Sequence, residues 1–414
     1  MSLLPRLISR RRFLAGAAAA GVGAVAVQTL AACSSSSNDT APQPAKVDAS
    51  GATFVFDSGE NKGSYAQASD DNGGVKSLTE AGSWNIPLGC VLRPSEGALK
   101  PYVAPGDAAS PMTVAGAFSV STGQATTLVK KAQAGGNYVV FDARCSDAVF
   151  AWSELDIVTR AWQLFAAPIQ SSGELGTVVS LWSADANYDP PQFTCSGSSV
   201  IWLVMPSTSG TKTTENSSCY LWQSGATSAD EVIRSQGRFG CPPAVSDGMV
   251  TLAPRVQTGQ SGRYYGITAY SLESKLQTQV AQLVLPASVQ PLYAVRMGDD
   301  FVFSVEANYG GSNLLSSMGT YIGTGDGRFV VLSREPAADV AGKDGVFLVK
   351  TRASHLILDT KANTYATLVA PNRALDYGDY PASVGTTSTF VTFATVKDQD
   401  TGYPSSVTVR AFAL

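Results

Sequence analysis

Short alternating runs of apolar and polar residues dominate the chain after residue 41. Gly, Asp, Ser and Pro interrupt these runs, and no segment keeps an apolar period of 3.6 residues over several turns. Alternation with a period of two is typical of strands that bury one face, and the interrupting residues are typical of turns. The pattern therefore predicts an all-β protein.

A pair of strands joined by a polar turn recurs along this region. The clearest copy is CPPAVSDGMVTLAP, residues 241–254, and six related stretches begin at Cys90, Ala143, Phe193, Ala294, Val340 and Ala382. Aligned on their second strands, the copies have equivalent positions at Leu99, Val149, Val200, Val250, Val302, Phe347 and Val391. The intervals are 50, 51, 50, 52, 45 and 44 residues. A nearly fixed period of this length indicates seven copies of one structural unit.

Each unit is long enough for four strands. Residues 264–285 and 112–129 each contain two further alternating runs separated by a tight turn. Units of this length and strand number resemble the blades of a β-propeller, an architecture that the kelch and WD-repeat families share. Because neither a series of Trp-Asp dipeptides nor a series of kelch-type diglycines is present, the resemblance is to the architecture alone. It implies a seven-bladed β-propeller of four-stranded blades over residues 51–414. A pair of β-sandwiches is the alternative, and it would not require one period.

The last unit ends at Leu414 after only its third strand. A ring left open there would expose strand edges, so we expect an N-terminal strand to close it. The segment 52–56 (ATFVF) is the more strand-like candidate, and 83–87 (SWNIP) is the weaker one. Either pairing would lock the first and last blades together.

The first 33 residues follow a different pattern, in which basic, apolar and small residues succeed one another before a cysteine. SRRRFL, with Arg10 and Arg11, resembles the twin-arginine export signal, and LAAC, ending at Cys33, resembles the lipobox of bacterial lipoproteins. The resemblance implies cleavage before Cys33 and attachment of lipid to its sulfur. Residues 34–50 have little apolar area and are predicted to form a flexible tether. We therefore expect an extracytoplasmic protein, anchored to the bacterial cell membrane by its lipid.

Removal of residues 1–32 changes the charge of the chain. The whole sequence has 29 basic and 33 acidic residues, and loss of Arg6, Arg10, Arg11 and Arg12 leaves 25 against 33, a net charge of −8. An acidic chain is not suited to nucleic acid as a partner. The sequence is interpreted as a binding or scaffolding protein at the cell envelope, with a glycan or an envelope protein as its partner.

Lipidation of Cys33 would leave five cysteines, an odd number. The propeller topology brings Cys219 near Cys241, which predicts a disulfide between them; two separate small buried residues are the alternative. Cys145 and Cys195 occupy equivalent positions one blade apart and are predicted to be separate core residues.

Motifs for catalysis and metal binding are sparse. The only histidine, His355, lies in a strand-like run, and neither a Gly-x-Ser-x-Gly elbow nor a Cys-x-x-Cys pair is present. The sequence therefore assigns no catalytic residue, metal or cofactor, and His355 is predicted to be a partly exposed strand residue. Trp152 and Trp202 are predicted to pack between blades.

Two loops between units combine acidic and aromatic residues. Their candidate ligand-binding residues are Tyr188, Asp189, Asp376, Tyr377, Asp379 and Tyr380. Aromatic rings stack against sugars or cations, and carboxylates bind hydroxyl groups. Paired carboxylates also cleave glycosidic bonds, so an extracytoplasmic carbohydrate-active enzyme is the alternative function. These residues could instead only shape the loops, because neighbouring prolines set the direction of the next strand and the tyrosines cap the core.

Overall fold

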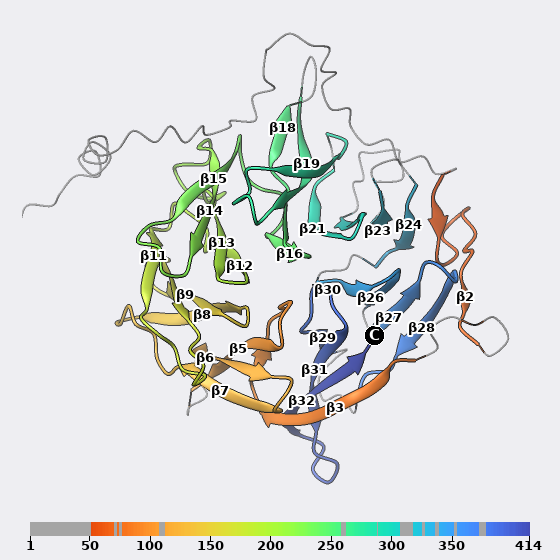
Figure 1. Cartoon of the computed structure of the whole chain (residues 1–414), viewed down its shortest axis with the longest axis horizontal. Helices are drawn as coiled ribbons and strands as arrows, with labels where there is room; N and C mark the ends of the chain where they lie inside the picture. The colour runs from red at the N-terminus through yellow and green to blue at the C-terminus, as the bar shows by residue number, and fades with distance from the viewer. Residues whose placement is uncertain are drawn as a thin grey trace, which may run out of the picture.

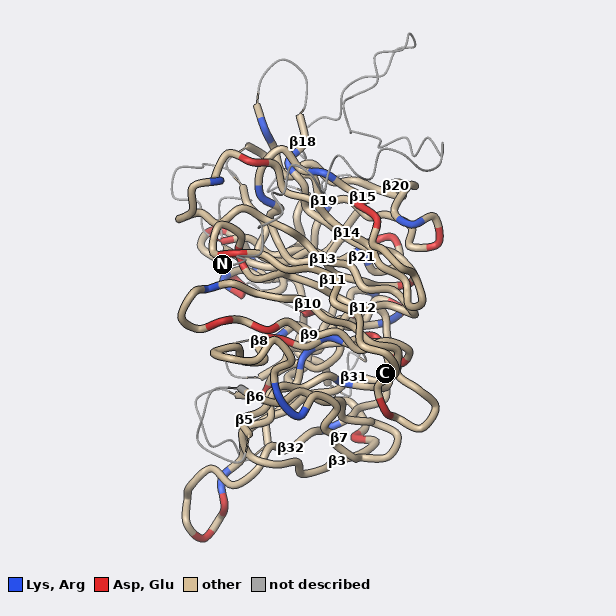
Figure 2. Tube along the Cα trace, turned by 90° about the vertical axis from the view of Figure 1, so that its left-hand side faces the viewer, with Lys and Arg blue, Asp and Glu red and all other residues tan. Residues whose placement is uncertain are grey.

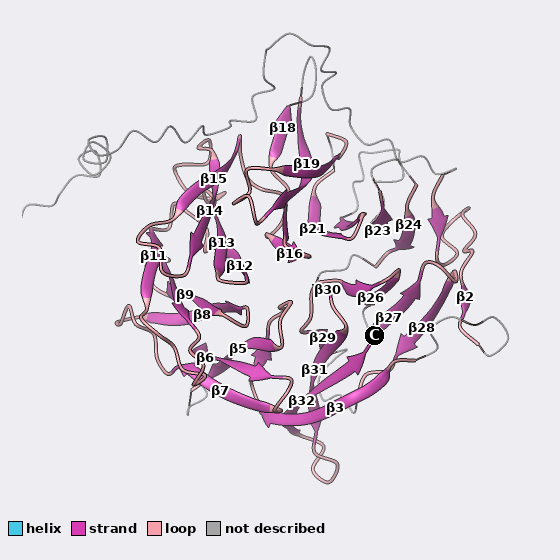
Figure 3. Ribbon diagram, viewed as in Figure 1, coloured by secondary structure: helices cyan, strands magenta, loops and turns pink. Residues whose placement is uncertain are grey.

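The structure is a computed structural model that describes residues 51–69, 73, 77–106, 112–257, 262–287, 289–306, 318–324, 328–335, 339–351, 354–371 and 378–414. Within these ranges the chain consists of strands and loops, without a helix (Figure 3). The described residues thus contain no helix of the length and apolarity needed to span a bilayer. The prediction of an all-β chain is confirmed.

The described strands form seven sheets around a common centre, the arrangement of a β-propeller (Figure 1). Sheet 1 contains β4 (Val91–Leu92), β5 (Leu99–Pro105), β6 (Met112–Ser119) and β7 (Gln124–Val129). Sheet 2 contains β8 (Tyr138–Cys145), β9 (Val149–Asp156), β10 (Trp162–Pro168) and β11 (Val179–Ala184). Sheet 3 contains β12 (Gln192–Ser196), β13 (Ser199–Val204), β14 (Ser217–Gln223) and β15 (Asp230–Ser235). Sheet 4 contains β16 (Ala244–Ser246), β17 (Met249–Leu252), β18 (Arg255–Gln257), β19 (Arg263–Ser271) and β20 (Gln279–Val284).

The last three sheets each include a strand from residues 53–87, which precede sheet 1 in the chain. Sheet 5 contains β21 (Pro291–Met297), β22 (Asp300–Val305), β23 (Gly319–Gly323), β24 (Val330–Ser333) and β1 (Thr53–Phe54). Sheet 6 contains β25 (Ala341–Lys343), β26 (Val346–Lys350), β27 (His355–Asp359), β28 (Thr364–Leu368), β2 (Ala66–Gln67) and β30 (Gly385–Thr386). Sheet 7 contains β29 (Asp379–Pro381), β31 (Thr389–Lys397), β32 (Pro404–Ala413) and β3 (Thr79–Pro87).

The repeat predicted from the sequence matches these sheets. Each of the seven equivalent positions lies in the second strand of a different sheet: Leu99 in β5, Val149 in β9, Val200 in β13, Val250 in β17, Val302 in β22, Phe347 in β26 and Val391 in β31. The propeller architecture is therefore confirmed, and the alternative of two sandwiches is wrong.

The outer edge of β32 pairs with β3, the weaker of the two predicted candidates. The preferred candidate, residues 52–56, lies elsewhere, because Thr53 and Phe54 pair in parallel with Val330 and Val331 of β24. The lengths of the strands explain the difference. β1 has two residues, whereas β3 has nine residues that can pair with the ten residues of β32. Together β1, β2 and β3 cover the outer edges of sheets 5, 6 and 7 (Figure 1), which leaves fewer strand edges open.

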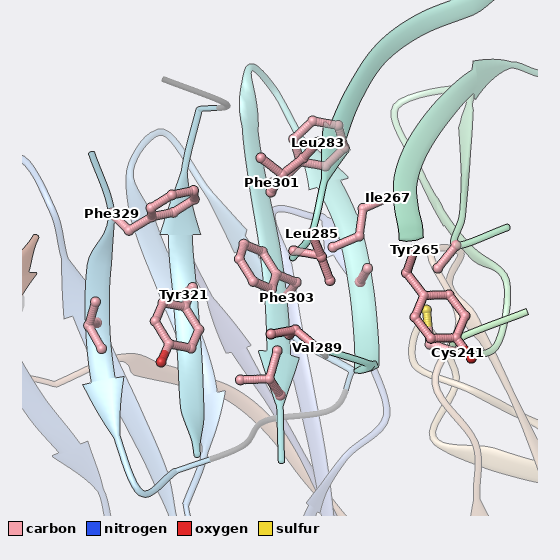
Figure 4. Close-up of a cluster of buried hydrophobic side chains, with 14 of the residues drawn as sticks. Cys241, Tyr265, Ile267, Leu283, Leu285, Val289, Phe301, Phe303, Tyr321 and Phe329 are labelled. Carbon is pink, nitrogen blue, oxygen red and sulfur yellow. The ribbon is translucent and has the colours of Figure 1, made fainter. Parts of the chain in front are cut away.

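The described core is divided into seven clusters, each between two neighbouring sheets. Figure 4 shows the cluster between sheets 4 and 5, in which Tyr265 and Ile267 of sheet 4 are buried together with Phe303 and Tyr321 of sheet 5. The rings of Phe303 and Tyr321 are stacked with centroids 5.3 Å apart. Burial of each such side chain stabilises the fold by about 1.5–3 kcal/mol.

Sheets 7 and 1 are joined in the same way as the other neighbours. Ile86 of β3 and Val407 of β32 are buried in one cluster with Leu92 and Tyr102 of sheet 1. The predicted packing of tryptophans between neighbours is also confirmed, because Trp152 is buried between sheets 1 and 2 and Trp202 between sheets 2 and 3.

Candidate functional site

The first predicted ligand loop is held by contacts within the protein. The hydroxyl of Tyr188 donates a hydrogen bond to Glu215 Oε2 at 2.8 Å, and Lys212 Nζ contacts both side chains. Asp189 Oδ2 forms an ion pair with Arg238 Nη2 at 2.7 Å. These contacts agree with the interpretation that the loop residues shape the loop.

In the second loop, the side chain of Asp379 is fully buried and does not face solvent. Its Oδ2 lies 3.3 Å from His355 Nδ1 and 3.2 Å from Arg410 Nη2. The prediction of a partly exposed His355 is wrong, because β27 is an interior strand of sheet 6 and the imidazole packs edge-on against Phe390 of sheet 7, with centroids 5.1 Å apart.

Several predicted residues lie outside the described ranges. They are Asp376 and Tyr377 of the second loop, and Arg10, Arg11 and Cys33 of the N-terminal segment, together with the tether 34–50.

The five described cysteines are all buried free thiols, so the predicted Cys219–Cys241 disulfide is absent. Cys219 packs in the cluster between sheets 3 and 4, whereas Cys241 packs between sheets 4 and 5. The two thiols therefore belong to different cores, on opposite faces of sheet 4. Cys145 and Cys195 are separate core residues, as predicted.

Tyr380, one of the candidates that the structure describes, lines a cavity. We call this cavity of about 510 Å³ the mouth pocket; it is bounded by Cys90, Val91, Leu92, Arg93, Pro94, Arg144, Asp339, Gly378, Tyr380, Pro381, Phe393 and Thr395. Its residues come from sheets 1, 2 and 7 and from the segment before β25 of sheet 6. Because sheets 2 and 6 are not neighbours, the mouth pocket lies at the centre of the ring. Neither Tyr188 nor Asp189 reaches it.

The polar wall of the mouth pocket contains Arg93 and Arg144, and both are held by Asp142. Its Oδ1 accepts from Arg93 Nε at 2.9 Å and from Arg144 Nη1 at 2.6 Å. Asp142 and Arg144 are two positions apart on β8, the spacing of residues on one strand face. The Arg144 guanidinium also lies 5.7 Å from the centroid of the Phe193 ring. Both guanidinium groups are thus held in place by contacts within the protein.

Asp339 places a carboxyl group in the same wall. Its backbone has a left-handed φ of 57°, which aspartate tolerates. Burial raises the pKa of Asp339 above its ordinary value, while the charges of Arg144 and Arg93 oppose this shift. The wall therefore offers both hydrogen-bond donors and a carboxyl group.

The other lining residues of the mouth pocket are mostly apolar or aromatic. The ring of Tyr380 is about half exposed, at 49% for the whole residue, and lies 5.7 Å from the ring of Phe393 between centroids. Lys350 Nζ lies 5.3 Å from the Tyr380 centroid. Burial raises the pKa of the Cys90 thiol to about 11, which keeps this thiol uncharged at neutral pH. Among the described residues, no group of His, Cys, Asp and Glu could hold a metal ion.

Sequence reasoning missed the charged residues of the mouth pocket. The signal was available in YVVFDARC, where Asp142 and Arg144 share a face of an innermost strand. The contribution of Arg93 and Asp339 had no such signal, because they come from other units of the chain.

The chain is similar to the propeller domains of several peptidases and related hydrolases of known structure. The β-propeller domain of the Trilobed protease from Pyrococcus furiosus has 10% sequence identity over 78% of this chain and 94% of that chain, with a TM-score of 0.47. Uncomplexed acylaminoacyl peptidase from Pyrococcus horikoshii has 9% identity over 78% of this chain and 52% of that chain, with a TM-score of 0.48. Puromycin hydrolase has 11% identity over 80% of this chain and 56% of that chain, with a TM-score of 0.46.

This chain thus spans about half the length of the acylaminoacyl peptidases, and the likeness concerns the fold alone. No protein-family model matches the sequence, and no curated protein matches it.

Proposed function

We propose that the protein is a binding protein of the cell envelope and that the mouth pocket binds a glycan. The observation that carries the proposal is the pairing of a half-exposed tyrosine ring with fixed arginines and a carboxyl group in one cavity of about 510 Å³. This volume is in the range of small-ligand sites. The C–H face of a sugar would stack on Tyr380, while its hydroxyl groups would exchange hydrogen bonds with Arg93, Arg144 and Asp339.

We further propose that the body is a closed ring of seven blades in which β3 is the closing strand. The pairing of β3 with β32 and the shared core of sheets 7 and 1 support this arrangement. A closed ring would hold the four contributing sheets of the mouth pocket at fixed distances, which lowers the entropy lost on binding.

For the N-terminal segment we propose twin-arginine export through Arg10 and Arg11 and lipidation of Cys33. Residues 34–50 would then be the tether between the membrane and the ring, with the protein outside the cytoplasm and the membrane as one of its partners. Metabolic labelling with a fatty acid tests the anchor: the label should be present in the wild type and absent in Cys33→Ser.

Binding of glycans from the bacterial envelope, first on an array and then by calorimetry, tests the proposed site. Tyr380→Ala and Arg144→Gln should each weaken binding by about tenfold or more. The first removes the stacking surface, and the second removes a charged hydrogen bond. Tyr403→Ala is the matched control, since Tyr403 is 75% exposed in the turn between β31 and β32. Equal affinities for all three variants and the wild type would overturn the site.

A carbohydrate-active enzyme is the second candidate, and the raised pKa of Asp339 favours it, because a general acid must be protonated near neutral pH. It has less support, since Asp189 is paired with Arg238 and Asp379 is buried, which leaves no described partner from the predicted loops. Chromatography of glycans incubated with wild type and Asp339→Asn distinguishes the two functions. Cleavage by the wild type alone would establish the enzyme.

A further inference from the structure

Three arginines line one cavity beside sheet 4, separate from the mouth pocket. This second cavity, of about 520 Å³, is lined by Thr208, Gln236, Gly237, Arg238, Arg255, Arg263, Tyr265 and Gln290. Arg238 comes from the connection between β15 and β16, whereas Arg255 and Arg263 lie on β18 and β19. In the pairing of β18 with β19, Arg255 is opposite Tyr265 and Gln257 is opposite Arg263. Arg255 and Arg263 are therefore diagonal neighbours on one face of this strand pair.

Two of these arginines are held in place by the protein. The guanidinium carbon of Arg255 lies 3.6 Å from the centroid of the Tyr265 ring, and Tyr265 is almost fully buried. Arg238 Nη2 is paired with Asp189 at 2.7 Å, and its Nη1 donates to the carbonyl oxygen of Pro206. Stacking and ion pairing fix the direction of both side chains, which lowers the cost of ordering them around a ligand.

The charges at this cavity do not balance. Three arginines stand against one carboxylate, that of Asp189, which leaves a net charge of +2. Within the described ranges, neither Arg255 nor Arg263 has a carboxylate partner. Figure 2 shows basic segments of the chain gathered around β18, although the whole protein has a net charge of −4. Like charges at one cavity repel each other, and a bound anion would relieve that repulsion.

We propose that this cavity is a binding site for the phosphate group of a small molecule. The guanidinium group presents planar pairs of N–H donors that match the oxygens of phosphate. The volume exceeds that of a single phosphate and lies in the range of small-ligand sites, so a phosphomonoester fits better than the bare ion. Asp189 is a positioning residue here, because it orients Arg238.

Calorimetric titration of the whole protein with inorganic phosphate, glycerol phosphate and glycerol tests the site. The wild type should bind glycerol phosphate more tightly than inorganic phosphate, with no binding of glycerol, and added sodium chloride should weaken binding. Arg255→Gln and Arg263→Gln should each raise Kd by about tenfold or more, because each removes a charged hydrogen-bond donor.

Arg160→Gln is the matched control, since Arg160 is an exposed arginine in the turn between β9 and β10. It removes the same charge from another part of the surface and should leave Kd unchanged. Thermal melts of all variants check the fold, and Arg263→Gln keeps the test valid if loss of the Arg255 stacking destabilises sheet 4. The proposal is overturned if the wild type binds no phosphate compound, if glycerol binds equally well, or if Arg160→Gln weakens binding as much as Arg263→Gln.

Discussion

The hydroxyl of Thr408 donates a hydrogen bond to the side-chain oxygen of Asn85 at 2.7 Å, across 323 positions of the chain. The two residues are direct cross-strand partners on β32 and β3. A contact of this sequence separation must overcome the entropy of closing a very long loop. It forms because β3 buries apolar side chains on the adjoining face, among them Ile86.

Ile86→Ala should therefore lower the free energy of unfolding by about 2–5 kcal/mol, because it leaves a cavity between sheets 7 and 1. Urea denaturation followed by tryptophan fluorescence measures the change. Leu88→Ala is the control, since Leu88 is exposed just beyond β3 and should change stability by less than about 0.5 kcal/mol. Similar losses in both variants would contradict a role of β3 in the core that sheets 7 and 1 share.

The five buried thiols lead to a second prediction. In Cys33→Ser, without reductant, a thiol reagent should react slowly with the native protein and with five cysteines after denaturation. Burial slows the native reaction, and it also raises the pKa of Cys195 and of Cys241 to about 12, which keeps both protonated. A count of three thiols after denaturation, two fewer than five, would mean that a disulfide is present after all.

Glu154 of β9 is a fully buried carboxylate with partners both in the link between sheets 1 and 2 and on its own strand. Its two oxygens accept hydrogen bonds from the backbone N–H of Gln133 and of Ala134, both at 2.8 Å, and from Trp152 Nε1 at 2.9 Å. Glu154→Gln would replace one oxygen with an NH₂ group that faces a donor. We expect a loss of about 1–3 kcal/mol in the free energy of unfolding, measured with urea. Glu174→Gln, at an exposed carboxylate, should have no measurable effect.

The sequence predicted the sheets because each unit repeats the same local pattern. Val149, Val200 and Val250 lie near the start of the second strand of successive sheets, at nearly equal intervals. Strand alternation and turn residues are local properties, so they can be recognised without knowledge of the fold. The choice of the strand that pairs with β32 depended instead on length and register, and 52–56 has the better composition but the shorter pairing.

The candidate sites could not be predicted to the same extent. Arg93 follows β4 of sheet 1, whereas its partner Asp142 lies on β8 of sheet 2. Asp189 precedes β12 of sheet 3, whereas its partner Arg238 lies in the connection between β15 and β16. Such pairs depend on where the ring places distant loops, which no local pattern encodes. The burial of Asp379 was missed for the same reason, because its partners His355 and Arg410 come from two other strands.

The buried His355 makes stability depend on pH. Burial lowers the pKa of His355 below its ordinary value of 6.5, and Lys350 and Arg410 lower it further, while Asp379 opposes the shift. Between the lowered pKa and 6.5 the unfolded chain binds a proton that the folded chain does not, so stability falls as pH decreases through this window. His355→Gln removes that proton and should reduce the slope of unfolding free energy against pH.

Because His355 is the only histidine, the test can be made without ambiguity. Urea denaturation at several values between pH 5 and pH 8 gives the slope for wild type and variant, and the imidazole NMR signals of the native protein report its protonation directly. The difference between the two slopes should disappear above about pH 7, where both folded and unfolded wild type hold a neutral imidazole. Equal slopes throughout, or a native imidazole that titrates near its ordinary pKa, would contradict the prediction and would mean that the contact with Asp379 offsets the effect of burial.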